Sequence, residues 1–163
     1  MKNIFRILMA VLVLGATSCT TEDISSTVVG NGELIEVSFS ADVANLGTRA
    51  TTGLGTKATT LKYRVFDAAN KTLLSELCGQ TTGSLAEGKM TFTFNLVMVK
   101  GMTYDIVLWA DAGNGIYTLK DDGKTVTANY NGVTANNENL DAFCKFVEGF
   151  DPLEDTPKFT LRR

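Results

Sequence analysis

The chain has 163 residues, with 15 Lys and Arg against 18 Asp and Glu, no histidine and a formal net charge of −3. This mildly acidic balance argues against nucleic acid and anionic lipid headgroups as partners. Without histidine, imidazole-based catalytic dyads and triads are excluded, and so is the commonest metal ligand. The sequence also lacks paired-cysteine zinc spacing and a glycine-rich phosphate loop. We therefore predict a protein that is not an enzyme and has no cofactor, bound metal or small-molecule substrate.

The first 18 residues have the order of a secretory signal peptide. Lys2 and Arg6 form a positive start, residues 7–14 are an apolar run, and residues 15–18 are small. The apolar run is shorter than the roughly 20 residues that a membrane-spanning helix needs. A buried first helix is the alternative interpretation. Removal of this segment takes away Lys2 and Arg6, which changes the net charge from −3 to −5.

The segment Ala16-Thr17-Ser18-Cys19 resembles the lipobox of bacterial lipoproteins, although Ala16 stands where Leu, Val or Ile is usual. The resemblance implies that the Cys19 sulfur carries a diacylglycerol with acyl chains such as palmitate. Two or more such chains give stable anchoring, here in the outer membrane of a Gram-negative bacterium and facing the cell surface. Residues 19–33 are then a polar, flexible tether. An ordinary secreted protein with an incidental Cys19 is the alternative.

From residue 34 onward the apolar residues recur with a period of two, which predicts β-strands. The expected strands are 34–43, 61–68, 72–78, 89–98, 102–111, 116–119, 125–130 and 158–161, with 61–68 and 72–78 paired as a hairpin. Residues 44–60 are expected to be a loop, and residues 136–143 have room for one helical turn. Val107 and Trp109 indicate that 102–111 is covered on both faces. About seven strands at this spacing predict an all-β, Greek-key β-sandwich over residues 34–163.

Several side chains are candidates for chemistry. A two-carboxylate hydrolase would draw on Asp105, Asp111, Glu138 and Asp141. We expect Asp105 to be solvated instead and Asp111 to take part in the turn at the end of its strand. Asp151, Glu154 and Asp155 lack the regular spacing of a calcium loop, so a solvated acidic loop is the favoured interpretation. Aromatic residues at strand positions are expected in the core rather than on a glycan-binding surface; they are Tyr63, Phe66, Phe92, Phe94 and Trp109.

Two cysteines follow Cys19. An extracytoplasmic location permits a disulfide between Cys78 and Cys144. Two separate, buried free thiols are the alternative, since sequence alone does not place the two Cα atoms within bonding range.

Three stretches, LKYRVFD at 61–67, VKGMTYDIVLWA at 99–110 and NENLDAF at 137–143, carry a wider resemblance. They resemble the N-terminal domain of fimbrillin-like lipoproteins, the major and minor fimbrial subunit type, a domain often described only as of unknown function. The resemblance covers residues 30–163. It implies a transthyretin-like or immunoglobulin-like sandwich, display on the cell surface, a structural role in a fimbrium and in cell adhesion, and other fimbrial subunits as partners.

In fimbrial subunits of this type, an arginine-specific protease cuts an early loop. The strand upstream then leaves, and a strand from the next subunit fills the groove by β-strand addition. Arg49 occupies the corresponding position, after the expected strand 34–43. An exposed arginine in a tolerant loop is the alternative. Family subunits usually carry a second β-domain with the donor strand, and this chain ends at Arg163, where that domain would follow; it has no obvious strand to donate.

Two other functions compete with the fimbrial one. The first is a monomeric, lipid-anchored surface module that binds a glycan or a host protein, which requires an exposed aromatic or polar patch. The second is the carboxylate-dependent hydrolase, which requires two carboxylates roughly 5–10 Å apart in a cleft.

Overall fold

The computed structural model describes residues 32–44, 55–134 and 137–163. These residues form ten strands and two short 3₁₀ helices, so the all-β expectation is confirmed and the expected number of strands was too low. The elements are β1 Leu34–Val43, β2 Thr60–Asp67, η1 Ser75–Leu77, β3 Gly79–Thr82, β4 Ser84–Ala86, β5 Lys89–Val99, β6 Tyr104–Asp111, β7 Tyr117–Leu119, β8 Val126–Ala128, η2 Glu138–Leu140, β9 Phe143–Phe150 and β10 Lys158–Leu161. None of the helices in these ranges is long and apolar enough to span a membrane.

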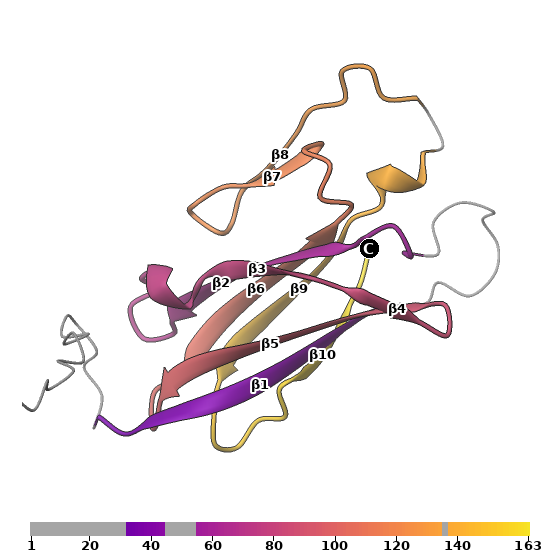
Figure 1. Cartoon of the computed structure of the whole chain (residues 1–163). Helices are drawn as coiled ribbons and strands as arrows, with labels where there is room; N and C mark the ends of the chain where they lie inside the picture. Colours follow the sequence, from indigo (N-terminus) through magenta and orange to yellow (C-terminus); the bar gives the residue numbers. More distant parts are fainter. Residues whose placement is uncertain (1–31, 45–54, 135–136) are drawn as a thin grey trace, which may run out of the picture.

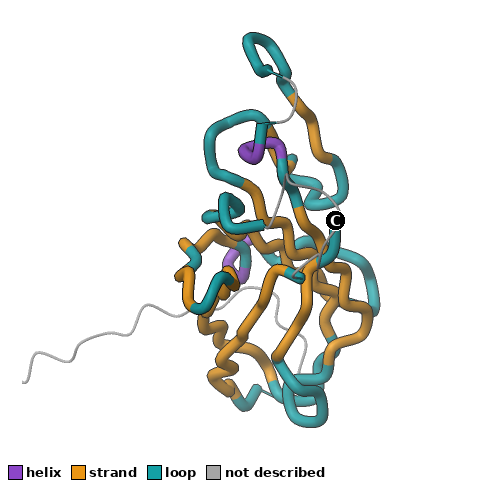
Figure 2. The backbone as a smooth tube through the Cα atoms, turned by 90° about the vertical axis from the view of Figure 1, so that its right-hand side faces the viewer, coloured by secondary structure: helices purple, strands orange, loops and turns teal. Residues whose placement is uncertain are grey.

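Eight of the strands form two four-stranded sheets (Figure 1). Sheet A has the order β10-β1-β5-β4, and sheet B has the order β3-β2-β6-β9. The remaining pair, β7 and β8, forms a hairpin outside the two sheets. Loops and short helical turns connect the strands (Figure 2). Most neighbours are antiparallel, but β10 runs parallel to β1.

The sheets are connected at both edges. Gly83 separates β3 from β4, so one stretch of chain leaves sheet B and enters sheet A there. At the opposite edge, the backbones of Cys144 in β9 and Arg162 after β10 exchange two N–H···O hydrogen bonds of 2.7 and 3.0 Å.

The alternating residues of both sheets meet in one core. Phe39 of β1 stacks on Phe94 of β5 at 5.0 Å between ring centroids, and Phe150 of β9 lies 5.2 Å from Phe39. Phe92 and Phe94 are buried, and Tyr63 packs against the same cluster, so these three core predictions are confirmed. The period-two pattern places these side chains on the inner faces because successive strand residues point to opposite sides.

Three strands differ from expectation, namely β3, β4 and β9, and β4 lies where no strand was expected. The expected strand 72–78 is wrong: only Leu73 bridges to β2, and η1 follows. Leu74 and Leu77 both pack against the core, and a spacing of three suits a 3₁₀ turn rather than a strand. The hairpin with β2 is made instead by β3, which begins at Gly79.

Strand β9 was not predicted. Its pairing with β6 shifts by one residue between Val147 and Phe150, where Gly149 has a φ of 66°. Such a bulge breaks the alternation that marks a strand in sequence. The single helical turn expected within 136–143 is present as η2.

Candidate functional site

The two residues predicted to be processed, Cys19 and Arg49, lie outside the described residues. Cys78 and Cys144 are both free thiols. Cys78 adjoins β3 and Cys144 lies in β9, with β2 and β6 between them. Strands lie about 4.8 Å apart, so the two Cα atoms are roughly 14 Å apart, beyond the ~7 Å limit of a disulfide. The two thiols are therefore free, but neither is buried as the alternative expected: Cys78 is half-buried and Cys144 is exposed. Burial raises the pKa of Cys78.

The carboxylates Asp105 and Asp111 both lie on β6, and both are buried, so the expectation that Asp105 is solvated is wrong. Asp111 accepts hydrogen bonds from Lys62 Nζ at 3.0 Å, Trp109 Nε1 at 2.8 Å and the Gly113 N–H at 2.7 Å. The last bond confirms its role in a turn. Six residues of strand separate the two carboxylates by about 20 Å, too far for a glycosidase-type pair.

Asp105 accepts hydrogen bonds from Lys71 Nζ at 2.7 Å and from the Gly149 N–H at 3.0 Å. Burial alone raises the pKa of Asp105, but these hydrogen bonds and the charge of Lys71 outweigh it and hold the pKa below its ordinary value. The carboxylate is therefore ionised and paired, and it secures the β9 bulge through Gly149.

The remaining acidic candidates do not converge either. Asp141 is buried and paired with Arg163, while Glu138 is exposed. Asp151 accepts from the Leu153 N–H, and Asp155 accepts from the Asp151 N–H, so both cap a local turn. Across 32–44, 55–134 and 137–163, no group of three or more Asp, Glu, Cys and His side chains is arranged to hold a metal ion.

The outer face of sheet B holds the aromatic residues that the core does not. Trp109 is half-buried there, so its assignment to the core was wrong. Its ring meets Tyr117 edge-on at 5.7 Å, and Tyr117 meets Tyr130 at 6.2 Å. The Tyr117 hydroxyl donates to the Leu140 carbonyl at 2.8 Å. Burial, followed by the neighbouring Tyr130 hydroxyl, raises the pKa of Tyr117 to about 12.

The β7–β8 hairpin lies across this outer face and divides it into two grooves. The hairpin packs closely against β2 at Gly123, where an added Cβ would lie 2.7 Å from the Phe66 ring and 2.9 Å from Arg64 Cβ. Leu119 of β7 is also buried. Phe66 is buried beneath the hairpin, outside the main core cluster.

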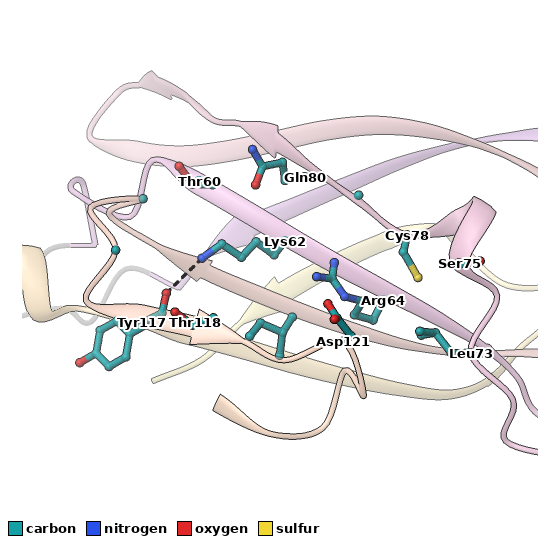
Figure 3. Close-up of a pocket in the computed structure, with 14 residues that line it drawn as sticks. Thr60, Lys62, Arg64, Leu73, Ser75, Cys78, Gln80, Tyr117, Thr118 and Asp121 are labelled. Carbon is teal, nitrogen blue, oxygen red and sulfur yellow. Dashed lines mark hydrogen bonds between the residues drawn. The ribbon is translucent and has the colours of Figure 1, made fainter. Parts of the chain in front are cut away.

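The first groove, of about 700 Å³, lies over β2 and β3 and has both polar and apolar lining (Figure 3). Lys62 points across it to Asp111, and Arg64 donates to the Tyr63 carbonyl at 3.0 Å. In the described chain Arg64 has no acidic partner within ion-pair distance. Cys78 lines this groove, but a thiol with a raised pKa is a weak nucleophile at neutral pH. The groove thus offers hydrogen bonding and charge, without an activated nucleophile.

The second groove, of about 540 Å³, lies between the hairpin and β9 and is mainly apolar. Val107, Trp109 and Phe146 come from β6 and β9, and Leu119 and Val126 come from the hairpin. Sequence analysis did not find either groove. The alternation of β2 and β6 does mark Lys62, Arg64, Val107 and Trp109 as facing away from the core, but no local pattern shows that β9 and the hairpin lie beside them.

The chain has no match among protein-family models, curated proteins or solved structures.

Proposed function

We propose that this chain is a structural subunit of fimbrial or adhesin type, not an enzyme. In this proposal Cys19 carries a lipid that anchors the chain in the outer membrane, and the folded domain is displayed at the cell surface. Cleavage after Arg49 releases β1, and a strand from another subunit takes its place. The observation that supports the proposal most strongly is the position of β1 in sheet A.

Strand β1 is an inner strand with a partner on each side. Nine residue pairs join it to β5, and four join it to β10. Its inward side chains are buried in the core; they are Val37, Phe39, Ala41 and Val43. Its C-terminal end leads directly into residues 45–54, which contain Arg49. A cut there separates β1 covalently from every other described strand.

Loss of β1 would leave a groove that only another strand fits. The facing edges of β5 and β10 would lose their hydrogen-bond partners, and unpaired buried backbone groups are costly. The floor of the groove would be apolar, since β1 covers Phe92, Phe94 and the inner face of sheet B. A replacement strand must therefore supply main-chain hydrogen bonds together with apolar side chains at alternate positions.

The proposed fold is the immunoglobulin-like or transthyretin-like Greek-key sandwich. The spatial order of the strands supports it. The order β4-β5-β1 in sheet A matches strands D-E-B of an immunoglobulin domain, and the order β3-β2-β6-β9 in sheet B matches strands C′-C-F-G. Tyr104 gives independent support. It is the first residue of β6, and its hydroxyl accepts a hydrogen bond of 2.8 Å from the Val99 N–H at the end of β5. A tyrosine in this position and contact is a hallmark of that fold.

The test is intact-mass analysis of the full chain from its native membrane, before and after an arginine-specific protease. We expect a lipidated Cys19 at the start, a single early cut after Arg49, and a trimmed domain that stays folded by circular dichroism. The trimmed domain should then bind a synthetic peptide of residues 34–43.

An Arg49→Lys variant is the matched control, since it keeps the charge and removes the protease site. Resistance of Arg49 to the protease, or unfolding of the domain on cleavage, would favour the monomeric surface module instead. An unmodified Cys19 would contradict the lipid anchor.

A further inference from the structure

The edge of the molecule where β9 meets β10 is only partly closed. Strand β9 is the edge strand of sheet B and β10 is the edge strand of sheet A, and the two lie side by side (Figure 1). In the described chain a single bridge joins them, between Cys144 and Arg162. Phe146 and Thr160, each two residues from the bridge, are not paired with each other. A groove of about 560 Å³ lies there between the two strands.

Main-chain groups face this groove from both sides. The N–H and C=O of Cys144 and of Arg162 point toward each other, since they form the two hydrogen bonds of the bridge. In a strand, the main-chain groups of residues two apart point to the same side. Phe146 and Thr160 therefore present their N–H and C=O groups to the groove, and neither has a strand partner on that side among the described residues. Such an edge is a template for a further strand, so the groove fits an extended polypeptide.

The charges of the groove indicate which polypeptide fits. Its lining contains three cations and one carboxylate; they are Lys145, Lys158, Arg162 and Glu148. None of the four belongs to an ion pair within 32–44, 55–134 and 137–163. Lys145 is opposed to buried Leu108 of β6 but is itself exposed, because β9 is an edge strand whose inner face opens toward β10. Three unpaired cations against one carboxylate, in a chain of net charge −3, favour an acidic partner.

We propose that this groove binds an extended, acidic segment of another polypeptide by β-strand addition. The segment forms main-chain hydrogen bonds with Phe146 and Thr160, and its carboxylates lie beside the three cations. Lysines at a sheet edge commonly prevent association with other strands. Here they repel basic strands and favour acidic ones, so the same charges provide specificity. The site exists while β1 is in place, so it does not depend on the exchange of β1.

The two faces of the added strand meet different surroundings. Its inward side chains meet Val147 and Phe159, which pack against the core. Its outward side chains lie beside Lys158 and beside Phe146, whose side chain is 54% exposed. A heptapeptide that alternates glutamate with valine suits both faces, because successive strand residues point to opposite sides.

The experiment measures binding of this peptide, fluorescently labelled, to the full chain by fluorescence anisotropy. The chain carries Arg49→Lys, so that β1 stays in place, and is reconstituted with phosphatidylcholine vesicles. We expect saturable binding that weakens as salt is added, since salt screens exposed charges. Hydrogen exchange followed by mass spectrometry locates the peptide. At a peptide concentration about ten times the dissociation constant, exchange of the Phe146 and Thr160 amides should slow about tenfold. Absence of binding, or protection of other amides only, would overturn the proposal.

Two altered peptides separate strand addition from simple charge attraction. A peptide with lysine in place of each glutamate should bind at least tenfold more weakly. A peptide with an N-methyl group on each valine keeps all its carboxylates but loses every N–H on one side of the strand, and it should not bind. Equal binding by the lysine peptide would overturn the assignment to an acidic segment, and equal binding by the N-methylated peptide would overturn strand addition.

A pair of charge variants tests the groove itself. Lys145→Gln with Lys158→Gln should weaken binding of the glutamate peptide at least tenfold while the circular dichroism spectrum stays unchanged. Lys57→Gln with Lys120→Gln is the matched control, since it changes the net charge equally at two exposed lysines outside the groove. The control should bind the peptide as the parent chain does. Equal loss of binding in both double variants would mean that net charge, rather than this groove, attracts the peptide.

Discussion

Asp42, Asp105 and Asp111 are buried, and each accepts a hydrogen bond from a lysine ammonium. Asp42 receives Lys89 at 2.5 Å and the Thr91 hydroxyl at 2.8 Å. A buried carboxylate without such partners would protonate or destabilise the fold. Asp42 and Asp111 pair across neighbouring strands of one sheet, and Asp105 connects β6 to the turn that follows β2. These carboxylates therefore stabilise the fold.

The carboxylate of Asp105 gives a prediction that depends on pH. Its pKa is below the ordinary value of 3.8 in the folded protein, so its stabilising effect is present above pH 3.8 and is lost as pH falls through the folded pKa. Asp105→Asn should therefore lower the free energy of unfolding at pH 7, by about 2 kcal/mol. The difference from the parent chain should shrink below pH 4.

Urea unfolding of both chains between pH 2 and 7 measures this difference. Asp121→Asn serves as the control because Asp121 is exposed and makes no ion pair in the described residues. A deficit for Asp105→Asn that stays constant across the whole pH range would contradict the proposed role of the charge.

At the scale of elements, the β5–β6 corner is held by one side chain. The Tyr104 ring is buried, and its hydroxyl accepts from the Val99 N–H and donates to the Val99 carbonyl at 3.4 Å. Tyr104→Phe keeps the ring and removes the hydroxyl, which leaves a buried N–H without a partner. We expect the free energy of unfolding to fall by about 1–2 kcal/mol. Thermal or urea unfolding measures the loss, and Tyr130→Phe, at an exposed ring, should change stability little.

The strands differ in how well the alternation of apolar and polar residues predicts them. β1, β5 and β6 were predictable because one face of each meets the core and the alternation in their residues is regular. β9 was not, since its bulge at Gly149 and its position at a sheet edge leave only Phe143 and Phe150 buried. β3 was placed too early because Leu74 and Leu77 resemble strand residues while they lie in and beside a 3₁₀ turn.

The candidate sites were less predictable than the strands. Val126 and Phe146 are 20 positions apart in the sequence, and they line one groove between the hairpin and β9. Both elements have weak local patterns, so no sequence argument places them together. Cys19, by contrast, is predicted from a short local motif, and Arg49 is predicted from its position after the first expected strand in the family resemblance. Both residues lie outside the described residues.

At the scale of the whole molecule, the proposed assembly requires β1 to leave sheet A, and a covalent lock tests that requirement. Ser38 and Asn95 are directly opposed in β1 and β5, and the Ser38 hydroxyl donates to Asn95 Oδ1 at 2.6 Å. Opposed residues of antiparallel strands have Cα atoms about 4.5–5.5 Å apart, within the range of a disulfide. Both side chains are solvent-accessible, so Ser38→Cys with Asn95→Cys should preserve the fold.

After cleavage at Arg49, the oxidised double variant should keep β1 and should not exchange it for a labelled peptide of residues 34–43. Reduction should restore exchange in the same sample, because only the covalent link has changed. A second cysteine pair, at Thr118 and Thr127 in the β7–β8 hairpin, is the matched control, since those residues are also opposed but belong to a different sheet from β1. That control should exchange the peptide in both redox states. Equal exchange by the oxidised and reduced Ser38–Asn95 variant would mean that the peptide binds elsewhere, and strand replacement would then be the wrong account of assembly.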